Sequence, residues 1–199
     1  EEPGGLQFVQ EAAAAGKKVM IGHANPSAEI IRQAVRRGAA GATHFGNGAP
    51  PAIHRHRNPL WTLLASPSLR VGLICDGFHL PPDLVKTVRM CKPGGMCFAV
   101  SDASGEGGLP AGEYSSFGKR KIVIGDDRKI SLPDSEILAG AWYQLDRGVE
   151  FLVQQAGLTL PEAWRMCSAA PAWFAGIDLP RLAVGEEASF VVARWDGGL

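Results

Sequence analysis

Met96-Cys97-Phe98-Ala99-Val100-Ser101-Asp102 is a short apolar run that ends abruptly on a carboxylate. The glycine-rich segment Gly105-Glu106-Gly107-Gly108 follows closely. An apolar run bounded in this way is typical of a buried parallel strand whose last residue reaches the edge of the sheet. The pattern therefore predicts one acid at the end of a central strand, beside a loop with few bulky side chains.

Three earlier segments repeat this pattern, and each ends on a residue that can bind a metal ion or transfer a proton. They are residues 19–23, 39–44 and 70–76, and a further histidine follows the last of them. Helical segments are expected between the strands, at residues 5–15, 28–37, 60–65 and 83–91. Such alternation predicts an α/β fold with a parallel sheet and right-handed crossovers. Because active groups of such sheets lie at the carboxyl ends of the strands, five polar side chains are expected to gather there: His23, His44, Asp76, His79 and Asp102.

The alternation of strands and helices changes after Asp102. Residues 113–132 alternate loosely between apolar and polar side chains, with a turn at Gly125-Asp126-Asp127, which predicts a β-hairpin. Helices are expected at residues 138–156 and 160–170, and a last strand at residues 188–193. A closed (β/α)₈ barrel needs about 250 residues and eight strands. Four β/α units therefore predict an open half-barrel, whose bare strand edges need partner strands from an N-terminal segment or from another chain.

The composition of the chain excludes several classes of function. Of its 199 residues, 46% are hydrophobic and 20% are charged, and the formal net charge is zero, which argues for a globular protein without an extended nucleic-acid surface. No apolar run approaches the roughly 18–20 residues that span a bilayer. The four cysteines lack CxxC spacing and lie in or beside apolar segments, so we expect buried free thiols and a cytoplasmic location: Cys75, Cys91, Cys97 and Cys167.

Several of these polar residues have both a chemical and a structural interpretation. His23 and His44 follow successive strands and suit a divalent metal ion, but both could equally be hydrogen-bonded loop histidines. Asp102 could act as a general base on a metal-bound water, or could form a helix cap or a loop ion pair. His79 could donate a hydrogen bond to an oxyanion or be a solvated loop residue, and Asp76 is expected to orient the loop that carries His79.

The basic loop His54-Arg55-His56-Arg57, together with Asn47-Gly48, could bind an anion, although a solvated loop is the alternative. Three tryptophans lie in apolar helical contexts and are expected in the core: Trp61, Trp164 and Trp173. Taken together, the residues favour the catalytic half of a metal-dependent hydrolase.

Five ordered motifs are similar to those of the N-acetylglucosamine-6-phosphate deacetylase family, within the amidohydrolase superfamily. They are Gly22-His23-Ala24-Asn25, Thr43-His44-Phe45-Gly46-Asn47-Gly48, Cys75-Asp76-Gly77-Phe78-His79, Val100-Ser101-Asp102 and Ile137-Leu138-Ala139-Gly140. The resemblance implies that residues 1–180 are the C-terminal half of a metal-dependent TIM-like (β/α)₈ barrel. It also implies that residues 181–199 contribute strands to a small β-sandwich, and that the enzyme removes acetate from N-acetylglucosamine 6-phosphate or a similar amino sugar phosphate.

The resemblance also assigns roles to individual residues. His23 and His44 resemble the metal-binding histidines of one Zn²⁺ or Fe²⁺ ion, with a glutamate upstream of Glu1 as a further ligand, and Asp102 resembles the catalytic acid/base. Arg55 stands where the family places a phosphate-binding arginine that can reach a neighbouring subunit of a homodimer, and Arg57 competes for this role. The substrate-binding positions implied by the resemblance are Asn47, Gly48, Arg55, Asp76, His79, Leu138 and Ala139.

Two departures from the family pattern bear on substrate specificity. The segment after the second histidine reads Asn47-Gly48-Ala49, where the family is closer to Asn-Ala-Met, and Ala139 stands where a small hydroxyl residue is common. Two alternatives stay open at this point. One is another amidohydrolase, similar to a dihydroorotase or a dipeptidase. The other is an inactive fragment that lacks a metal ligand and dimerises through its open sheet edge.

Overall fold

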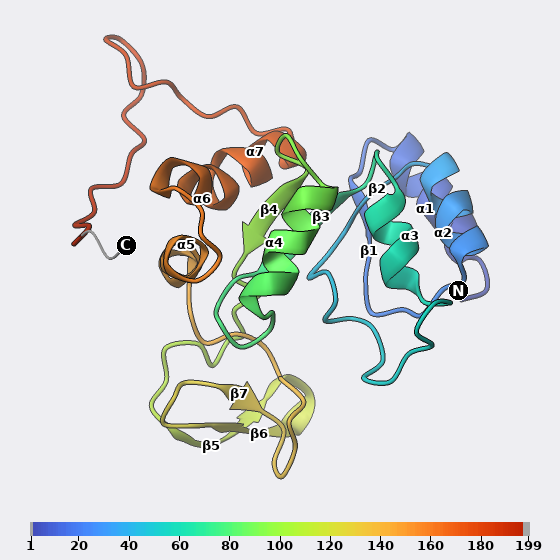
Figure 1. Cartoon of the computed structure of the whole chain (residues 1–199), viewed down its shortest axis with the longest axis horizontal. Helices are drawn as coiled ribbons and strands as arrows, with labels where there is room; N and C mark the ends of the chain where they lie inside the picture. Colours follow the sequence, from blue (N-terminus) through green and yellow to red (C-terminus); the bar gives the residue numbers. More distant parts are fainter. Residues whose placement is uncertain (1, 197–199) are drawn as a thin grey trace.

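The computed structural model describes residues 2–196 and contains two separate sheets (Figure 1). Four parallel strands form the first sheet in the order β1-β2-β3-β4. The predicted α/β fold with a parallel sheet is therefore confirmed. The bounds of the strands are Val19–Ile21 for β1, Ala39–Ala42 for β2, Arg70–Ile74 for β3 and Cys97–Val100 for β4.

Each parallel strand follows a helix, as the sequence predicts. The helices are α1 (Gly5–Ala14), α2 (Ala28–Arg36), α3 (Pro59–Ala65) and α4 (Pro82–Cys91). Local signals fix where they begin. The Ser27 hydroxyl accepts a hydrogen bond from the Ile30 N–H at 3.4 Å, and the Asn58 side chain accepts one from the Leu60 N–H at 3.0 Å. Both residues act as N-caps, which satisfy backbone donors that have no partner inside the helix.

The main core lies between one face of the parallel sheet and the surrounding helices. Val71 and Leu73 of β3 are fully buried there, and the same cluster includes Ile31 of α2, Val85 of α4 and Leu152 of a later helix. Because side chains alternate along a strand, the neighbouring residues of β3 and β4 face the other way. On that second face Phe98 stacks on Phe174, with ring centroids 5.1 Å apart. The sheet is therefore covered by different elements on its two faces.

The second sheet is antiparallel and follows the end of β4. It consists of β5 (Gly112–Ser116), β6 (Arg120–Ile124) and β7 (Ile130–Ser131), with the short 3₁₀ helix η1 (Phe117–Lys119) between the first two strands. Ile122, Ile124 and Ile130 form its small core. The hairpin expected at residues 113–132 is present, and the turn after Gly125 leads into a third strand. Figure 1 shows this sheet apart from the parallel one.

The helices that follow differ from the prediction in where they begin and end. Helix α5 (Leu145–Gln154) starts well after residue 138, because residues 137–141 are committed to other backbone partners. The Ala139 N–H donates to the Ile130 carbonyl, and the Ala141 N–H donates to the Asp102 carbonyl. The single helix expected at residues 160–170 is two, α6 (Leu160–Cys167) and α7 (Ala169–Ala175). Ser168 separates them with a non-helical backbone, φ −133° and ψ −76°.

Residues 181–196 contain no assigned strand in the part of the chain that the structure describes. The assignment of residues 181–199 to a β-sandwich therefore stays a prediction, and residues 197–199 lie outside the described residues. Exposed apolar side chains are frequent in this segment and include Val184, Phe190 and Val192.

Two expectations about burial were wrong. Trp61, Trp164 and Trp173 are 55%, 40% and 65% exposed, because each lies on the solvent side of its short helix. Trp173 instead packs under the Arg70 guanidinium, 3.0 Å from the ring centroid. All four cysteines are free, but Cys91 is exposed at the end of α4. Between residues 2 and 196, no helix combines the length and apolar character needed to cross a membrane.

Candidate active site

The predicted polar residues lie at the same edge of the parallel sheet. His23, His44, Asp76 and Asp102 each stand two positions beyond the last residue of β1, β2, β3 and β4. Parallel strands present all their carboxyl ends at one edge, so the four side chains start from neighbouring points. The register of the sheet therefore brings them together without help from any long loop.

Three of these residues share an unusual backbone conformation. His23, His44 and Asp102 have φ values of 42°, 31° and 50°. Residues other than glycine rarely adopt this left-handed region, which costs free energy and is concentrated at functional sites. The chain thus turns sharply at the end of three strands, at the positions where the sequence predicts chemistry.

The imidazole rings of His23 and His44 are in contact. Their centroids are 4.5 Å apart, and the rings meet edge to face at 73°. Gly48 packs directly against both residues. A Cβ atom at this glycine would lie 3.1 Å from Cε1 of His44 and would overlap the backbone of His23. Gly48 was predicted to bind substrate, and its absent side chain also lets the loop close over the histidine pair.

His44 is the buried member of the pair, with 8% of its surface exposed. Burial lowers the pKa of His44, and the charge of His23 lowers it further, while Asp102 opposes the shift. The ring is therefore neutral near pH 7. Its Nδ1 atom is buried and has no hydrogen-bond partner within the described residues. A neutral imidazole with a free ring nitrogen is a good ligand for a divalent metal ion.

The histidine pair fits a metal ion as part of a ligand set. Catalytic zinc sites have three protein ligands and one open position. Within residues 2–196, no group of three histidine, cysteine, aspartate or glutamate side chains is placed to hold an ion. The described residues thus offer two imidazole donors, His23 and His44, and imidazole nitrogen suits Zn²⁺ or Fe²⁺.

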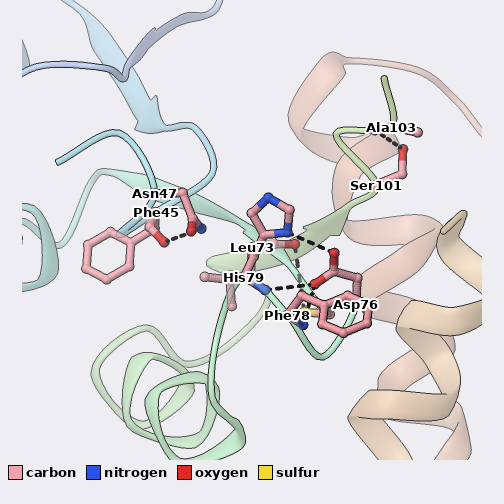
Figure 2. A network of polar contacts seen from close by, with 9 residues as sticks. Phe45, Asn47, Leu73, Asp76, Phe78, His79, Ser101 and Ala103 are labelled. Atoms are coloured by element: carbon pink, nitrogen blue, oxygen red, sulfur yellow. Dashed lines mark hydrogen bonds and ion pairs between the residues drawn. The ribbon is translucent and has the colours of Figure 1, made fainter. Parts of the chain in front are cut away.

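Asp76 and His79 form a buried pair (Figure 2), and His79 interacts electrostatically with His44. The His79 Nδ1 atom lies 2.8 Å from Asp76 Oδ2, and both side chains are 6% exposed. Asp76 Oδ1 also accepts the N–H groups of Phe78 at 2.9 Å and His79 at 3.0 Å. Burial alone would raise the pKa of Asp76, but the hydrogen bonds from His79 and Phe78 lower it below its ordinary value.

Asp102 is exposed at the end of β4 and interacts electrostatically with His44. Its carbonyl accepts the Ala141 N–H at 3.1 Å, which draws residues 138–141 alongside it. Leu138 bridges to Ser131, and Ala139 packs on the core of the second sheet. The predicted substrate-lining segment thus lies between Asp102 and the antiparallel sheet.

The remaining predicted residues lie in loops after β2. The Asn47 side chain folds back and donates to the Phe45 carbonyl at 3.5 Å (Figure 2). In the basic loop, His54 Nδ1 accepts the N–H groups of His56 and Arg57. The Arg55 carbonyl accepts a hydrogen bond from Trp61 Nε1 at 2.9 Å. The Arg55 side chain is exposed, and no hydrogen bond or ion pair of the described residues joins it to the histidine pair.

An aromatic row beside His79 was not foreseen from the sequence. The Phe78 ring stacks on Tyr143 with centroids 6.2 Å apart, and Tyr143 meets Trp142 edge to face at 4.9 Å. The adjacent Trp142 and Tyr143, close after the Ile137–Gly140 motif, were the available signal. This row links the loop of His79 to the segment that leads into α5.

Comparison with known proteins gives consistent results, although no family model matches the sequence. An N-acetylglucosamine-6-phosphate deacetylase from Vibrio furnissii is 30% identical over 98% of this chain and 49% of its own length. An N-acetylgalactosamine-6-phosphate deacetylase from Escherichia coli O157:H7 is 30% identical over the whole chain and 52% of its own length. A shorter relative from Escherichia coli (strain K12), whose name also contains N-acetylgalactosamine-6-phosphate deacetylase, is 30% identical over 78% of this chain and 91% of its own length.

The chain belongs to the N-acetylglucosamine-6-phosphate deacetylase family. It spans about half the length of the longer curated relatives that it matches. Solved structures agree with this deacetylase assignment. The N-acetylglucosamine-6-phosphate deacetylase from Pasteurella multocida superposes with a TM-score of 0.78 at 28% identity, over 87% of this chain and 45% of that one. The enzyme from Mycobacterium smegmatis, at 22% identity, shares the fold with a TM-score of 0.81.

Proposed function

We propose that this chain supplies the hydrolytic half of an enzyme that removes acetate from N-acetylglucosamine 6-phosphate or a similar N-acetyl amino sugar phosphate. The observation that carries the proposal is the contact between His23 and His44, 4.5 Å apart at the edge that also presents Asp102. An electrostatic interaction joins His44 to each of His23, Asp102 and His79. The relatives named for this reaction supply the substrate class.

The residues present can perform amide hydrolysis in two proton transfers. His23 and His44 would hold a divalent metal ion, which when bound would supply Lewis acidity and lower the pKa of a water molecule toward about 7. Asp102 takes one proton from the attacking water as its oxygen bonds to the acetyl carbon. Asp102 then gives that proton to the amine nitrogen as the C–N bond breaks. His79 donates a hydrogen bond to the oxygen of the acetyl group.

The other half of the barrel and the third metal ligand are assigned to residues outside this sequence. The parallel sheet is interpreted as the C-terminal half of a TIM-like barrel, because four β/α units are half of the eight in that fold. The third metal ligand, a glutamate, and the strands that would pair with the open sheet edges then belong to the other half. The free cysteines support a reducing, cytoplasmic location.

The phosphate group is proposed to bind Arg55 rather than Arg57. The Arg57 guanidinium lies 3.4 Å from the His54 ring nitrogen, whereas the Arg55 side chain is exposed and its backbone carbonyl is held by Trp61. Among the described residues no hydrogen bond or ion pair engages the Arg55 guanidinium, whose planar fork matches the geometry of a phosphate group. The relatives include both gluco and galacto enzymes, so the sugar is proposed only as an N-acetylhexosamine 6-phosphate.

Acetate release from the purified enzyme, loaded with Zn²⁺ or Fe²⁺, tests this function. We expect acetate and free amine in equal amounts from N-acetylglucosamine 6-phosphate, slower release from the sugar without phosphate, and no hydrolysis of the cyclic amide dihydroorotate. A chelator should stop the reaction, and added metal should restore it. A metal-loaded enzyme that hydrolyses dihydroorotate, but neither N-acetylglucosamine 6-phosphate nor the sugar without phosphate, would show that another amidohydrolase reaction is correct.

A further inference from the structure

The pairing of Asp76 with His79 uses hydrogen bonds of two kinds. Oδ1 accepts two backbone N–H groups, from Phe78 and His79, and so closes the turn. Gly77 sits in this turn at φ 88°, a conformation that suits glycine. Oδ2 has a different partner, Nδ1 of His79, at 2.8 Å. The same carboxylate therefore shapes the loop through one oxygen and contacts the imidazole through the other.

The second contact determines where the ring proton of His79 lies. An ionised carboxylate has no proton to donate, so Nδ1 must be the donor in this contact. The lowered pKa of Asp76 is consistent with the ionised form. In a neutral ring with its proton on Nδ1, the other nitrogen Nε2 carries only a lone pair. Nε2 can then donate a hydrogen bond only when the ring is an imidazolium cation.

We propose that Asp76 is a positioning residue, which keeps a proton on Nδ1 of His79 and supports the imidazolium form that presents an Nε2–H donor to the substrate. This inference rests on the proposed function for its catalytic consequence, but its statement about the proton does not. Asp76 does not itself touch the reacting atoms. It acts through His79, in the way that a buried carboxylate orients a catalytic histidine in a hydrolase triad.

Asp76→Asn separates this role from that of a simple loop anchor. An asparagine can keep both backbone hydrogen bonds through its oxygen, so the turn should survive. Its NH₂ group would then face Nδ1, which must accept, and the ring proton moves to Nε2. A residue that only holds the turn would tolerate this change. A residue that sets the protonation of His79 would not.

The direct readout is the nitrogen NMR spectrum of the chain labelled with ¹⁵N-histidine, with the His79 signals assigned from His79→Gln. We expect a protonated Nδ1 in the wild type and, in Asp76→Asn, a protonated Nε2 with a bare Nδ1. A wild-type ring with its proton on Nε2 and a bare Nδ1 would overturn the proposal. This wild-type measurement decides the matter even if the variant fails to fold, and it requires no enzymatic activity.

The kinetic readout uses deacetylation of N-acetylglucosamine 6-phosphate by the active enzyme. A charge-assisted hydrogen bond is roughly twice as strong as a neutral one, so we expect kcat of Asp76→Asn to fall about tenfold while KM stays within about twofold. Asp83→Asn makes the same charge change on α4, where the side chain is 92% exposed, and should alter neither kcat nor the His79 spectrum. A moved proton with unchanged kcat would show that Asp76 places the ring proton of His79 but would overturn its proposed effect on catalysis.

Discussion

At the scale of single residues, the site combines backbone strain with close polar contacts. His23, His44 and Asp102 all adopt left-handed conformations, each of which costs about 1–3 kcal/mol. This cost brings two imidazoles within 4.5 Å of each other and aims a carboxylate at the same region. The position of these residues after the strands was predictable from apolar runs, but their φ values and the Asp76–His79 contact were not. Those features depend on the three-dimensional course of the loops.

Asp102→Asn tests the acid/base role without changing the backbone, because asparagine tolerates the left-handed conformation as well as aspartate does. Loss of a general base typically slows turnover by about 10²–10⁴-fold, and we expect a loss in that range with unchanged metal content. Steady-state acetate release, with metal analysis of the same sample, provides the measurement. Near-normal turnover in the variant would remove Asp102 from this role.

The lowered pKa of Asp76 predicts how the stability of the fold depends on pH. A carboxyl whose pKa falls on folding stabilises the protein above its ordinary value of 3.8, and this contribution is lost as the pH drops through the folded value. Urea unfolding should therefore show that Asp76→Asn is less stable than the wild type at pH 7. The difference should shrink below about pH 3.8. A difference that is equal at both pH values would contradict the lowered pKa.

At the scale of elements, the sequence predicted the strands and the crossover helices because each carries its own local signals. Ser27 and Asn58 cap helices, and the strands are short apolar runs between glycine and polar residues. The start of α5 was not predictable, because residues 137–141 pair with partners far along the chain. Local propensity cannot report such a pairing, so an apparently helical stretch became a connecting segment beside Asp102.

Lys92, which follows α4, connects this helix by hydrogen bonds to the end of α3 and to the start of β3. This lysine is only 3% exposed, and its Nζ atom donates to the Leu69 carbonyl at 3.0 Å and to the Ser66 carbonyl. Lys92→Met keeps the side-chain length but leaves both carbonyls without this donor. We expect a loss of about 2–3 kcal/mol in the free energy of unfolding. Lys86→Met, at an exposed position within α4, should change it by less than about 0.5 kcal/mol, and equal effects of the two substitutions would exclude a stabilising role for the Lys92 hydrogen bonds.

At the scale of the whole molecule, the parallel sheet ends in β1 and β4, whose outer edges have no strand neighbour among the described residues. Exposed edges and apolar side chains favour association with further strands. When the strands proposed for the other half of the barrel are absent, we expect these edges to pair with a second copy, so that the chain forms a homodimer with a mass by light scattering of twice 21.1 kDa. A monomer at all concentrations tested would contradict this expectation and would leave the edges to a segment outside these residues.

X-ray absorption spectroscopy of the zinc-loaded protein tests most directly whether His23 and His44 hold a metal ion together. We expect two imidazole nitrogens at about 2.0–2.1 Å from the zinc, and the loss of one of them in His23→Ala and in His44→Ala. His54→Ala, in the basic loop, serves as the control and should leave the spectrum unchanged. A zinc spectrum without imidazole ligands, or one that neither alanine substitution alters, would contradict the account.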